Sequence, residues 1–313
     1  MGYVYSLIAA LLFGANGSVT KVIVDAGLSP AQLTFFRVLV SAILAGFLLL
    51  LTNRAAFRVS VRQLAIFAVL GIVGVAVLQF TYAVALSLLP VGITLLIEYT
   101  AVPMVAAIAF FFLHEQVKAR LWVAIGCVLV GLAIVAQVWS SELDPLGVVF
   151  AFCAAISLTI YFLGGEREVG KSSPLAVAFW TMLFATLFWA IFSGWWQLDP
   201  SVLVSEVSLT GNLAEVVVPL WVPLAWNVVL GSFLAFLLSL IALGRLKATA
   251  AGVVASSEVI FAFLIAWLWL GEALDSVQII GAGVVLVGIV LAQTARTDRV
   301  VDADLALVEH PPR

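Results

Sequence analysis

The stretch LLIEYTAVPMV, residues 95–105, decides the fold because it places one charged side chain, Glu98, inside a long apolar run. No other charge lies between Gly71 and His114, so the run can cross the hydrocarbon core of a bilayer twice as an α-helix. A helix satisfies its own backbone hydrogen bonds in lipid. The stretch therefore predicts membrane-spanning helices with an acid held between them.

The composition of the whole chain extends this prediction. Of the 313 residues, 65% are hydrophobic and 10% are charged, and the mean hydropathy is +1.24. A water-soluble domain carries about a quarter charged residues, so a soluble globular protein is excluded. We predict an all-α polytopic membrane protein with ten transmembrane helices, at about 3–24, 32–52, 64–86, 91–113, 121–139, 145–164, 174–196, 222–243, 249–270 and 277–295.

The basic residues predict the orientation of these spans. With the N-terminus inside, 12 of the 14 basic residues fall in cytoplasmic segments, Lys21 falls outside and Arg37 falls within the second span. By the positive-inside rule, we expect both termini on the cytoplasmic side of the inner (plasma) membrane. The first apolar run lacks a basic start and an obvious small-residue cleavage site, so we interpret it as a retained span rather than a signal peptide.

The chain resembles itself when it is shifted by 157 positions. The identities in this one register are Gly74 with Gly231, Ala85 with Ala242, Leu86 with Leu243, Glu115 with Glu272, Gly126 with Gly283, and Gly131 with Gly288. Each half holds five spans, an odd number, so the two copies are expected to lie in the membrane with opposite topology. We expect two inverted five-helix repeats, 1–140 and 141–296, and a disordered cytoplasmic tail, 297–313. The glycines at 126, 131, 283 and 288 predict close packing of the fifth and tenth spans.

Two acids, Glu98 and Glu258, fall near the middle of predicted spans. An ionisable group in hydrocarbon costs a few kcal/mol on insertion scales, about 2.5–3.5 kcal/mol at a helix centre, so such a group faces protein or water and usually has a function. A carboxylate here could bind an ammonium group of a substrate or take up a proton. The alternative is that each acid is paired, for example with Arg37, and only fixes the packing. Pro103 interrupts the helical ladder and could widen the centre, or it is a tolerated kink.

Polar side chains on neighbouring spans could complete a binding site around these acids. Each of them alone is typical of a hydrogen bond between helices, whereas several on converging spans favour a ligand. Tryptophan is usually an interface anchor, and we include one as a candidate for substrate contact. The candidate substrate-binding residues are Glu98, Gln79, Tyr82, Tyr99, Thr100, Asn16, Arg37, Tyr161, Trp180, Ser256, Ser257 and Glu258.

Three segments resemble a known family. EVIFAFLIAWLWLGE at 258–272 and SPAQLTFFR, which ends at Arg37, are similar to recurring segments of the drug/metabolite transporter superfamily, in its ten-span members with two EamA domains. EYTAVPMV at 98–105 is similar to the E-Y-T-A-P segment of the branch with threonine/homoserine and related amino-acid exporters. Here the proline comes one place later, at Pro103, and Val259 replaces the proline expected after Glu258.

These observations together predict a secondary transporter that works by alternating access. The resemblance implies an exporter of small metabolites, with amino acids or close analogues as the leading class and drugs, carboxylates or sugar and nucleotide derivatives as alternatives. Proton coupling through Glu98 is a separate hypothesis. We expect no enzyme activity, catalytic residue, cofactor, metal site or nucleic-acid partner, because the spans hold no nucleophile with a base, no Walker A segment occurs, and Cys127 and Cys153 fall in spans. A non-transporting scaffold remains an alternative, and we expect a monomer whose partners are the lipid bilayer and a small-molecule substrate.

Overall fold

Helices make up most of the chain in the computed structural model, which describes residues 2–111, 119–135, 143–169, 171–243, 254–255 and 257–294. The candidate residue Ser256 and the predicted tail at 297–313 lie outside the described residues.

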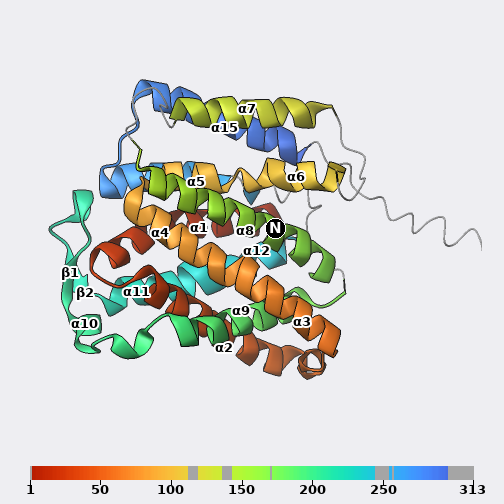
Figure 1. The fold of residues 1–313 in the computed structure, drawn as a ribbon. Coiled ribbons are helices and arrows are strands. Elements are labelled where there is room, and N and C mark those ends of the chain that lie inside the picture. The colour runs from red at the N-terminus through yellow and green to blue at the C-terminus, as the bar shows by residue number, and fades with distance from the viewer. Residues whose placement is uncertain are drawn as a thin grey trace, which may run out of the picture.

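The α-helices follow one another with short connections (Figure 1). They are α1 (Gly2–Asp25), α2 (Pro30–Thr52), α3 (Val61–Val69), α4 (Leu78–Leu88), α5 (Val91–Glu98), α6 (Ala101–Phe111), α7 (Arg120–Val135), α8 (Pro145–Val169), α9 (Pro174–Phe192), α10 (Ser201–Val204), α11 (Trp221–Val228), α12 (Ala235–Leu243), α14 (Ser257–Ile265) and α15 (Ser276–Gln293). The 3-10 turns are η1 (Arg54–Phe57), η3 (Trp195–Gln197) and η4 (Gly211–Leu213), and the π-helical segments are η2 (Leu70–Val77), η5 (Val229–Leu234) and η6 (Ala266–Leu270).

Serine followed by proline starts two of the long helices. Before α2, the Ser29 hydroxyl accepts from the backbone N–H of Gln32, and the Gln32 side chain accepts from the Ser29 N–H, each at 3.2 Å. This capping box satisfies two backbone donors that a helix start leaves free, and Pro30 occupies a position where no N–H is needed. Ser173 caps α9 in the same way, without the reciprocal bond.

The lengths of the apolar helices fit a polytopic membrane protein. In the described ranges, six are long and apolar enough to cross a membrane: Gly2–Asp25, Pro30–Thr52, Val61–Leu88, Pro145–Gly165, Pro174–Phe192 and Trp221–Ser239. Shorter apolar helices occupy Val91–Val105, Trp122–Val135, Ser257–Leu270 and Ser276–Leu291. These four fall within the remaining predicted spans.

Three long helices contain a π-helical segment. η2 joins α3 to α4, η5 joins α11 to α12, and η6 follows α14 directly. Gly74 lies in η2 and Gly231 lies in η5, so the pair that the 157-residue shift relates occurs in π-helical segments of both halves. A π turn is rare, and such turns frequently occur at functional sites.

The helices pack mainly as pairs drawn from the two halves of the chain. α2 packs along α9, α4 along α8, and α1 along α12 and α14. α7 and α15 lie side by side above the layer that contains α5 and α6 (Figure 1). The core that results is apolar and centred on α4, α5 and α14, as in the cluster around Leu86, Leu96 and Ala262.

The glycine prediction for α7 and α15 is half correct. A Cβ at Gly131 would come within 2.9 Å of the Gly281 carbonyl oxygen, and a Cβ at Gly288 would come equally close to the Ala124 carbonyl oxygen. Gly126 and Gly283 face open space among the described atoms, so their place in the contact was wrongly predicted. The helices cross at one face, and only glycines on that face are enclosed.

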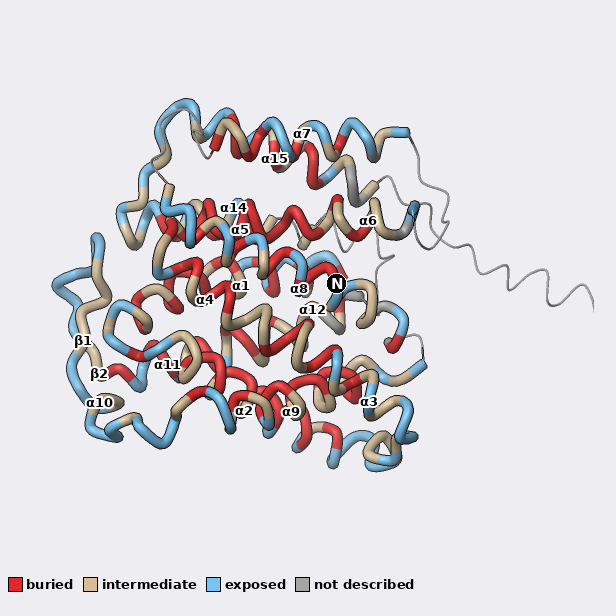
Figure 2. Tube along the Cα trace, viewed as in Figure 1, coloured by how far each residue is buried: buried red, intermediate tan, exposed pale blue. Residues whose placement is uncertain are grey.

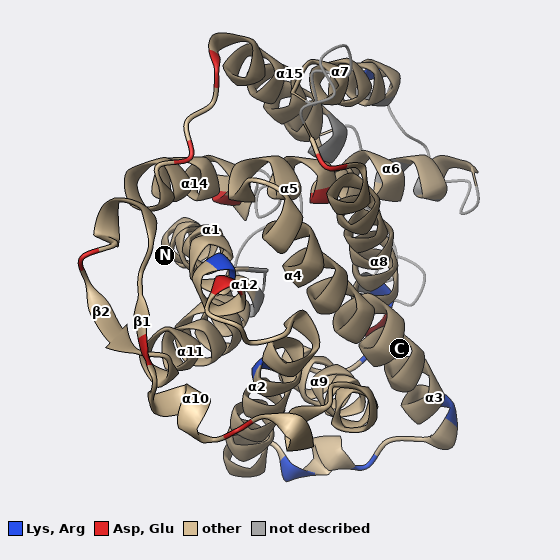
Figure 3. Cartoon of the chain, turned by 60° about the vertical axis from the view of Figure 1, so that its left-hand side comes forward, with Lys and Arg blue, Asp and Glu red and all other residues tan. Residues whose placement is uncertain are grey.

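Apolar side chains cover the outside of the bundle, as a lipid environment requires. Buried residues face the centre and exposed ones face outward (Figure 2), and the exposed set includes Leu51, Leu129, Ile191 and Ile280. Among the described residues, the charged ones lie mainly in the connections and near the ends of helices (Figure 3). A soluble monomer rarely exposes such continuous apolar surface, so this surface is suited to lipid.

One connection departs from the all-α prediction. Between α10 and α11, β1 (Glu206–Ser208) and β2 (Val217–Pro219) form an antiparallel hairpin in which Val207 lies opposite Val218. The strands are three residues each, and the hairpin lies at one end of the bundle (Figure 1).

Candidate functional site

The helix that carries Glu98 breaks immediately after that residue. α5 ends at Glu98 and α6 begins at Ala101, and the Thr100 N–H donates to the Ile97 carbonyl at 3.1 Å in a tightened turn. Pro103 explains the break four residues earlier. It has no N–H for the carbonyl of Tyr99, which accepts instead from Val102 at 3.0 Å.

Glu258, at the start of α14, is joined to this break by a hydrogen bond. The Tyr99 hydroxyl donates to the Glu258 carboxylate at 2.6 Å, across 159 positions of sequence. A donor to a carboxylate makes one of the stronger hydrogen bonds in proteins. The two predicted midspan acids therefore belong to one site, one on each side of Tyr99.

Arg37 is buried in α2 and does not form the ion pair proposed as an alternative. Its Nε donates to the Ser232 hydroxyl at 3.1 Å, and that hydroxyl donates to the Asn227 carbonyl at 2.9 Å. Within the described residues, the ion pairs shorter than 4.0 Å are Lys21 with Glu272 and Lys171 with Glu168.

Arg37, Tyr82, Glu98, Tyr99 and Glu258 form what we call the central polar cluster. Glu98 is close enough to Glu258 and Arg37 for direct electrostatic interaction. The Tyr82 hydroxyl interacts with all three charges, and the Tyr99 hydroxyl with the two glutamates. Glu98 is 9% exposed and Arg37 is 7% exposed. Charges at this depth interact more strongly than in water.

Several polar atoms in and around this cluster are buried without a hydrogen-bond partner among the described residues. They are Glu98 Oε2, Arg37 Nη1, Gln79 Oε1 and Asn16 Oδ1. A buried polar atom left unpaired costs about 1–3 kcal/mol, and native proteins hold few of them. The four atoms lie on α1, α2, α4 and α5 and are candidates for contact with a further polar group.

Close contacts of α1 bring its polar residues to the cluster. A Cβ at Gly14 would come within 2.9 Å of the Glu258 carbonyl oxygen, and one at Gly17 would come within 2.9 Å of the Tyr82 hydroxyl. Between them, the Asn16 side chain packs against Gly231 of η5, next to the serine that accepts from Arg37. Only glycine allows α1 to approach so closely.

The structure does not bring every predicted residue together. Thr100 lies in the break but donates to the Ile97 carbonyl at 2.7 Å, and Ser257 donates to the Val254 carbonyl at 2.6 Å, so both hydroxyls serve the backbone. Tyr161 lies outside the central polar cluster and packs against Gly74 and Phe236. Trp180 donates to the Ala56 carbonyl at 3.3 Å, beside the connection after α2.

Sequence reasoning missed four residues that shape the site. Gly14 is four residues from both Ala10 and Ser18, the spacing of a small-residue packing motif, and that spacing is the signal that could have found it; Gly17 has no such signal. Ser232 lies in the π-helical segment η5, and Asn227 lies in α11 just before it. No sequence pattern predicts that segment.

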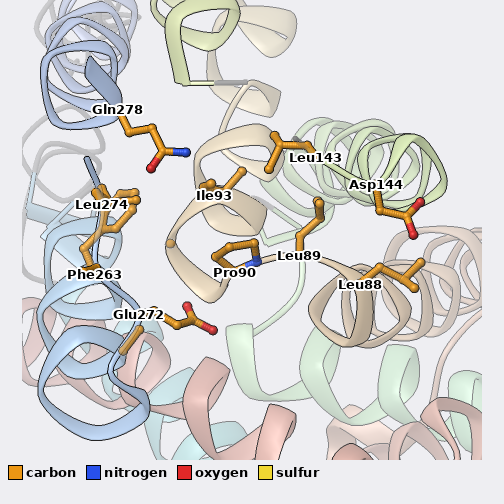
Figure 4. Close-up of a pocket in the computed structure, with 13 residues that line it drawn as sticks. Leu88, Leu89, Pro90, Ile93, Leu143, Asp144, Phe263, Glu272, Leu274 and Gln278 are labelled. Atoms are coloured by element: carbon orange, nitrogen blue, oxygen red, sulfur yellow. The ribbon is translucent and has the colours of Figure 1, made fainter. Parts of the chain in front are cut away.

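A cavity of about 280 Å³ lies at the beginning of α5 rather than around Glu98. Pro90, Ile93, Phe263 and Glu272 line it, and Asp144 and Gln278 add polar groups at its edge (Figure 4). Glu272 also accepts from Lys21 at 2.5 Å and from the Val91 N–H at 2.8 Å.

The fold and site define a class: a polytopic helical membrane protein with a buried polar cluster at its centre. Comparison with known families gives the particular one. Residues 1–137 and 145–294 match the EamA-like transporter family, so the chain belongs to that family, within the drug/metabolite transporter superfamily. The family name indicates a transporter rather than an enzyme.

Individual curated relatives and a solved structure match the chain at low sequence identity. The chain is 25% identical over 209 residues to the threonine/homoserine exporter RhtA of Escherichia coli strain K12, and equally to that of Escherichia coli O157:H7. The match covers 67% of this chain and 64% of each relative, slightly less than two thirds of their length. A crystal structure of a protein that is 16% identical aligns with a TM-score of 0.61, over 93% of this chain and 96% of the other, which supports the fold alone.

Proposed function

We propose that this chain is a secondary transporter of zwitterionic metabolites, with amino acids or close analogues as substrates and alternating access as the mechanism. One observation carries the proposal: a buried carboxylate atom, Glu98 Oε2, and a buried guanidinium atom, Arg37 Nη1, both lack a protein partner within the same cluster. An α-ammonium group would bind the first and an α-carboxylate the second. A buried unpaired group of each sign favours a ligand that carries both charges.

The name of the curated relatives agrees with this substrate class. They are threonine/homoserine exporters, and threonine and homoserine are zwitterions with an additional hydroxyl. Gln79, with its unpaired amide oxygen, could accept from such a hydroxyl. We propose export as the direction of net transport on the same ground.

The proposal of two inverted repeats is supported by the pairing of helices. α2 packs with α9 and α7 with α15, which are equivalent spans of the two proposed repeats. Gly74 of the third span packs against Tyr161 of the sixth, and Gly231 of the eighth span packs against Asn16 of the first. The two equivalent glycines therefore make equivalent contacts between the proposed repeats. Repeats related in this way place a substrate site at their interface. We further propose a monomer in the inner membrane with both termini cytoplasmic.

Binding of three related compounds tests the charge assignment. Threonine would be compared with the amine that lacks its carboxylate and with the hydroxy acid that lacks its ammonium group, by thermal stabilisation of the purified protein. We expect threonine to bind at least about tenfold more tightly than either, which corresponds to about 1.4 kcal/mol.

Variants assign each charge to its residue. In Glu98→Gln, the preference for threonine over the hydroxy acid should disappear, while the preference over the amine remains; Arg37→Gln should do the reverse. Equal binding of all three compounds by the wild-type protein would contradict the proposal. Stabilisation by drugs, single carboxylates or sugar derivatives instead would favour those substrate classes, and the absence of counterflow in proteoliposomes would favour a scaffold.

Proton coupling through Glu98 is a second proposal, because the same carboxylate can exchange a substrate cation for a proton. Counterflow measured across a range of pH in wild-type protein and in Glu98→Gln tests it. If the variant keeps both the flux and its pH dependence, Glu98 is not the coupling group.

A further inference from the structure

One motif singled out by the sequence, the Gly-Glu pair at 271–272, is not part of the central polar cluster. Gly271 adopts a left-handed conformation, with φ of 72°, which an L side chain rarely adopts. The chain turns back here, and the Glu272 N–H donates to the Ala266 carbonyl at 3.2 Å. The turn directs the Glu272 side chain toward α1 and α5.

Glu272 links its own segment to α1 and to α5 through its two carboxylate oxygens. One oxygen binds Lys21 Nζ of α1 at 2.5 Å, and the other accepts from the N–H of Val91, the first residue of α5, at 2.8 Å. Pro90 supplies no side-chain cap at this helix start. Glu272 therefore caps α5, where a carboxylate also interacts favourably with the helix dipole.

The three elements that Glu272 connects also contain or contact residues of the central polar cluster. α5 runs from Val91 to Glu98, a distance of roughly 10 Å at about 1.5 Å per residue. α14 carries Glu258 in its first turn and leads through η6 to Glu272. α1 contacts the cluster through Gly14 and Gly17 before it reaches Lys21.

Solvent reaches this contact but not the residues beneath it. The Lys21 and Glu272 side chains are 24% and 18% exposed, and Glu272 lines the cavity at the beginning of α5 (Figure 4). Thr94, one turn further along α5, is fully buried. The ion pair thus lies at the boundary between the accessible cavity and the closed centre.

We propose that Lys21, Glu272 and the Val91 N–H form a latch that closes the route from the central polar cluster to the cavity, and that opening of the transporter breaks it. This inference rests on the proposed alternating access, and on the side that we expect to face outward. A partly solvated ion pair suits a reversible closure, because each charge regains water when the pair separates and the net free energy of the pair is small. An apolar seal of the same size would expose its surface to water on opening.

A cysteine at a buried position of α5 reports whether the latch is closed. In a protein with Cys127 and Cys153 replaced by alanine, Thr94→Cys would be labelled with a membrane-impermeant cationic thiosulfonate, without any substrate. Lys21→Met and Glu272→Gln each remove the ion pair, and Glu272→Gln keeps an acceptor for the Val91 N–H. Glu272→Ala removes both contacts.

We expect Lys21→Met and Glu272→Gln to raise the labelling rate about threefold to fivefold, the factor that loss of a partly solvated ion pair adds to a two-state equilibrium. Glu272→Ala should raise it further. The double variant Lys21→Met with Glu272→Gln should match either single variant, because both remove the same contact.

Two controls separate a latch from a general loosening. Asp144→Asn removes another acid of the same cavity, and its side chain keeps an oxygen to accept from the Leu146 N–H, so labelling at Thr94→Cys should not change. Thr181→Cys, buried in α9, should stay protected in every latch variant. Unchanged labelling at position 94, or an equal increase at positions 94 and 181, would overturn the inference. Because no substrate is present, failure here is distinct from failure of the threonine-binding test.

Discussion

Replacing Tyr99 with phenylalanine isolates the hydrogen bond that joins the two halves of the site. The ring is buried and remains, so no cavity forms, and the change removes one hydroxyl that donates to Glu258 at 2.6 Å. Hydrogen bonds to charged groups are worth about 1.5–3 kcal/mol in soluble proteins, whereas side-chain hydrogen bonds in membrane proteins average about 0.6 and reach about 1.7 kcal/mol. A buried carboxylate as acceptor favours the upper membrane value, so we expect a destabilisation of about 1–2 kcal/mol.

Unfolding of the purified protein in mixed micelles would measure this loss. Tyr161→Phe is the matched control, since it removes a buried tyrosine hydroxyl outside the central polar cluster. In a double-mutant cycle with Glu258→Gln, the coupling should be about 1 kcal/mol, because both changes affect one bond. Wild-type stability in Tyr99→Phe, or a coupling near zero, would refute the reasoning that this bond ties α14 to the break after α5.

Three further changes test other features. Pro103→Ala restores a donor for the Tyr99 carbonyl. Counterflow should fall, while the stability measured by thermal unfolding should be unchanged or higher by about 0.5–1 kcal/mol. Unaltered transport would show that the break has no role. Gly17→Val should destabilise by about 1–3 kcal/mol through contact with Tyr82 and Val91, whereas Gly126→Ala, which faces open space, should not. In the connection after η3, hydrogen bonds from Ser201 lower the pKa of Asp199, so this carboxylate stabilises its turn above the unfolded pKa of about 4 and the effect is lost as the pH falls through the folded pKa. The protection factor of the Ser201 amide, its exchange rate compared with that of an unfolded chain at the same pH, should therefore fall in acid, and Asp199→Ala should remove that pH dependence.

The sequence predicted which residues would be buried together better than it predicted how they would interact. Glu98 and Glu258 were expected near the middle of spans, and both belong to the central polar cluster. The expected break at Pro103 occurs at Tyr99 and Thr100, because a missing N–H affects the carbonyl four residues earlier. The bond between Tyr99 and Glu258 links positions 159 apart, and it depends on a helix contact that no local pattern specifies.

Other features had no local signal. The π-helical segments η2, η5 and η6 occur in apolar sequence that reads as continuous helix. The strands β1 and β2 are too short to show an alternating pattern of apolar and polar residues in the sequence. Ser29 and Ser173 were different, because serine before proline is a start signal with a direct physical cause, and both helices begin there.

The placement of α7 and α15 has a practical consequence for spectroscopy. These helices pack on each other, with α5 and α6 between them and the rest of the bundle (Figure 1). Leu129 on α7 and Val287 on α15 are exposed. A pair of spectroscopic probes at those two positions would provide a fixed reference distance within the same molecule. Distances from these probes to a third probe on α2 or α9 would then report rearrangement of the bundle directly, in a detergent micelle or in a nanodisc.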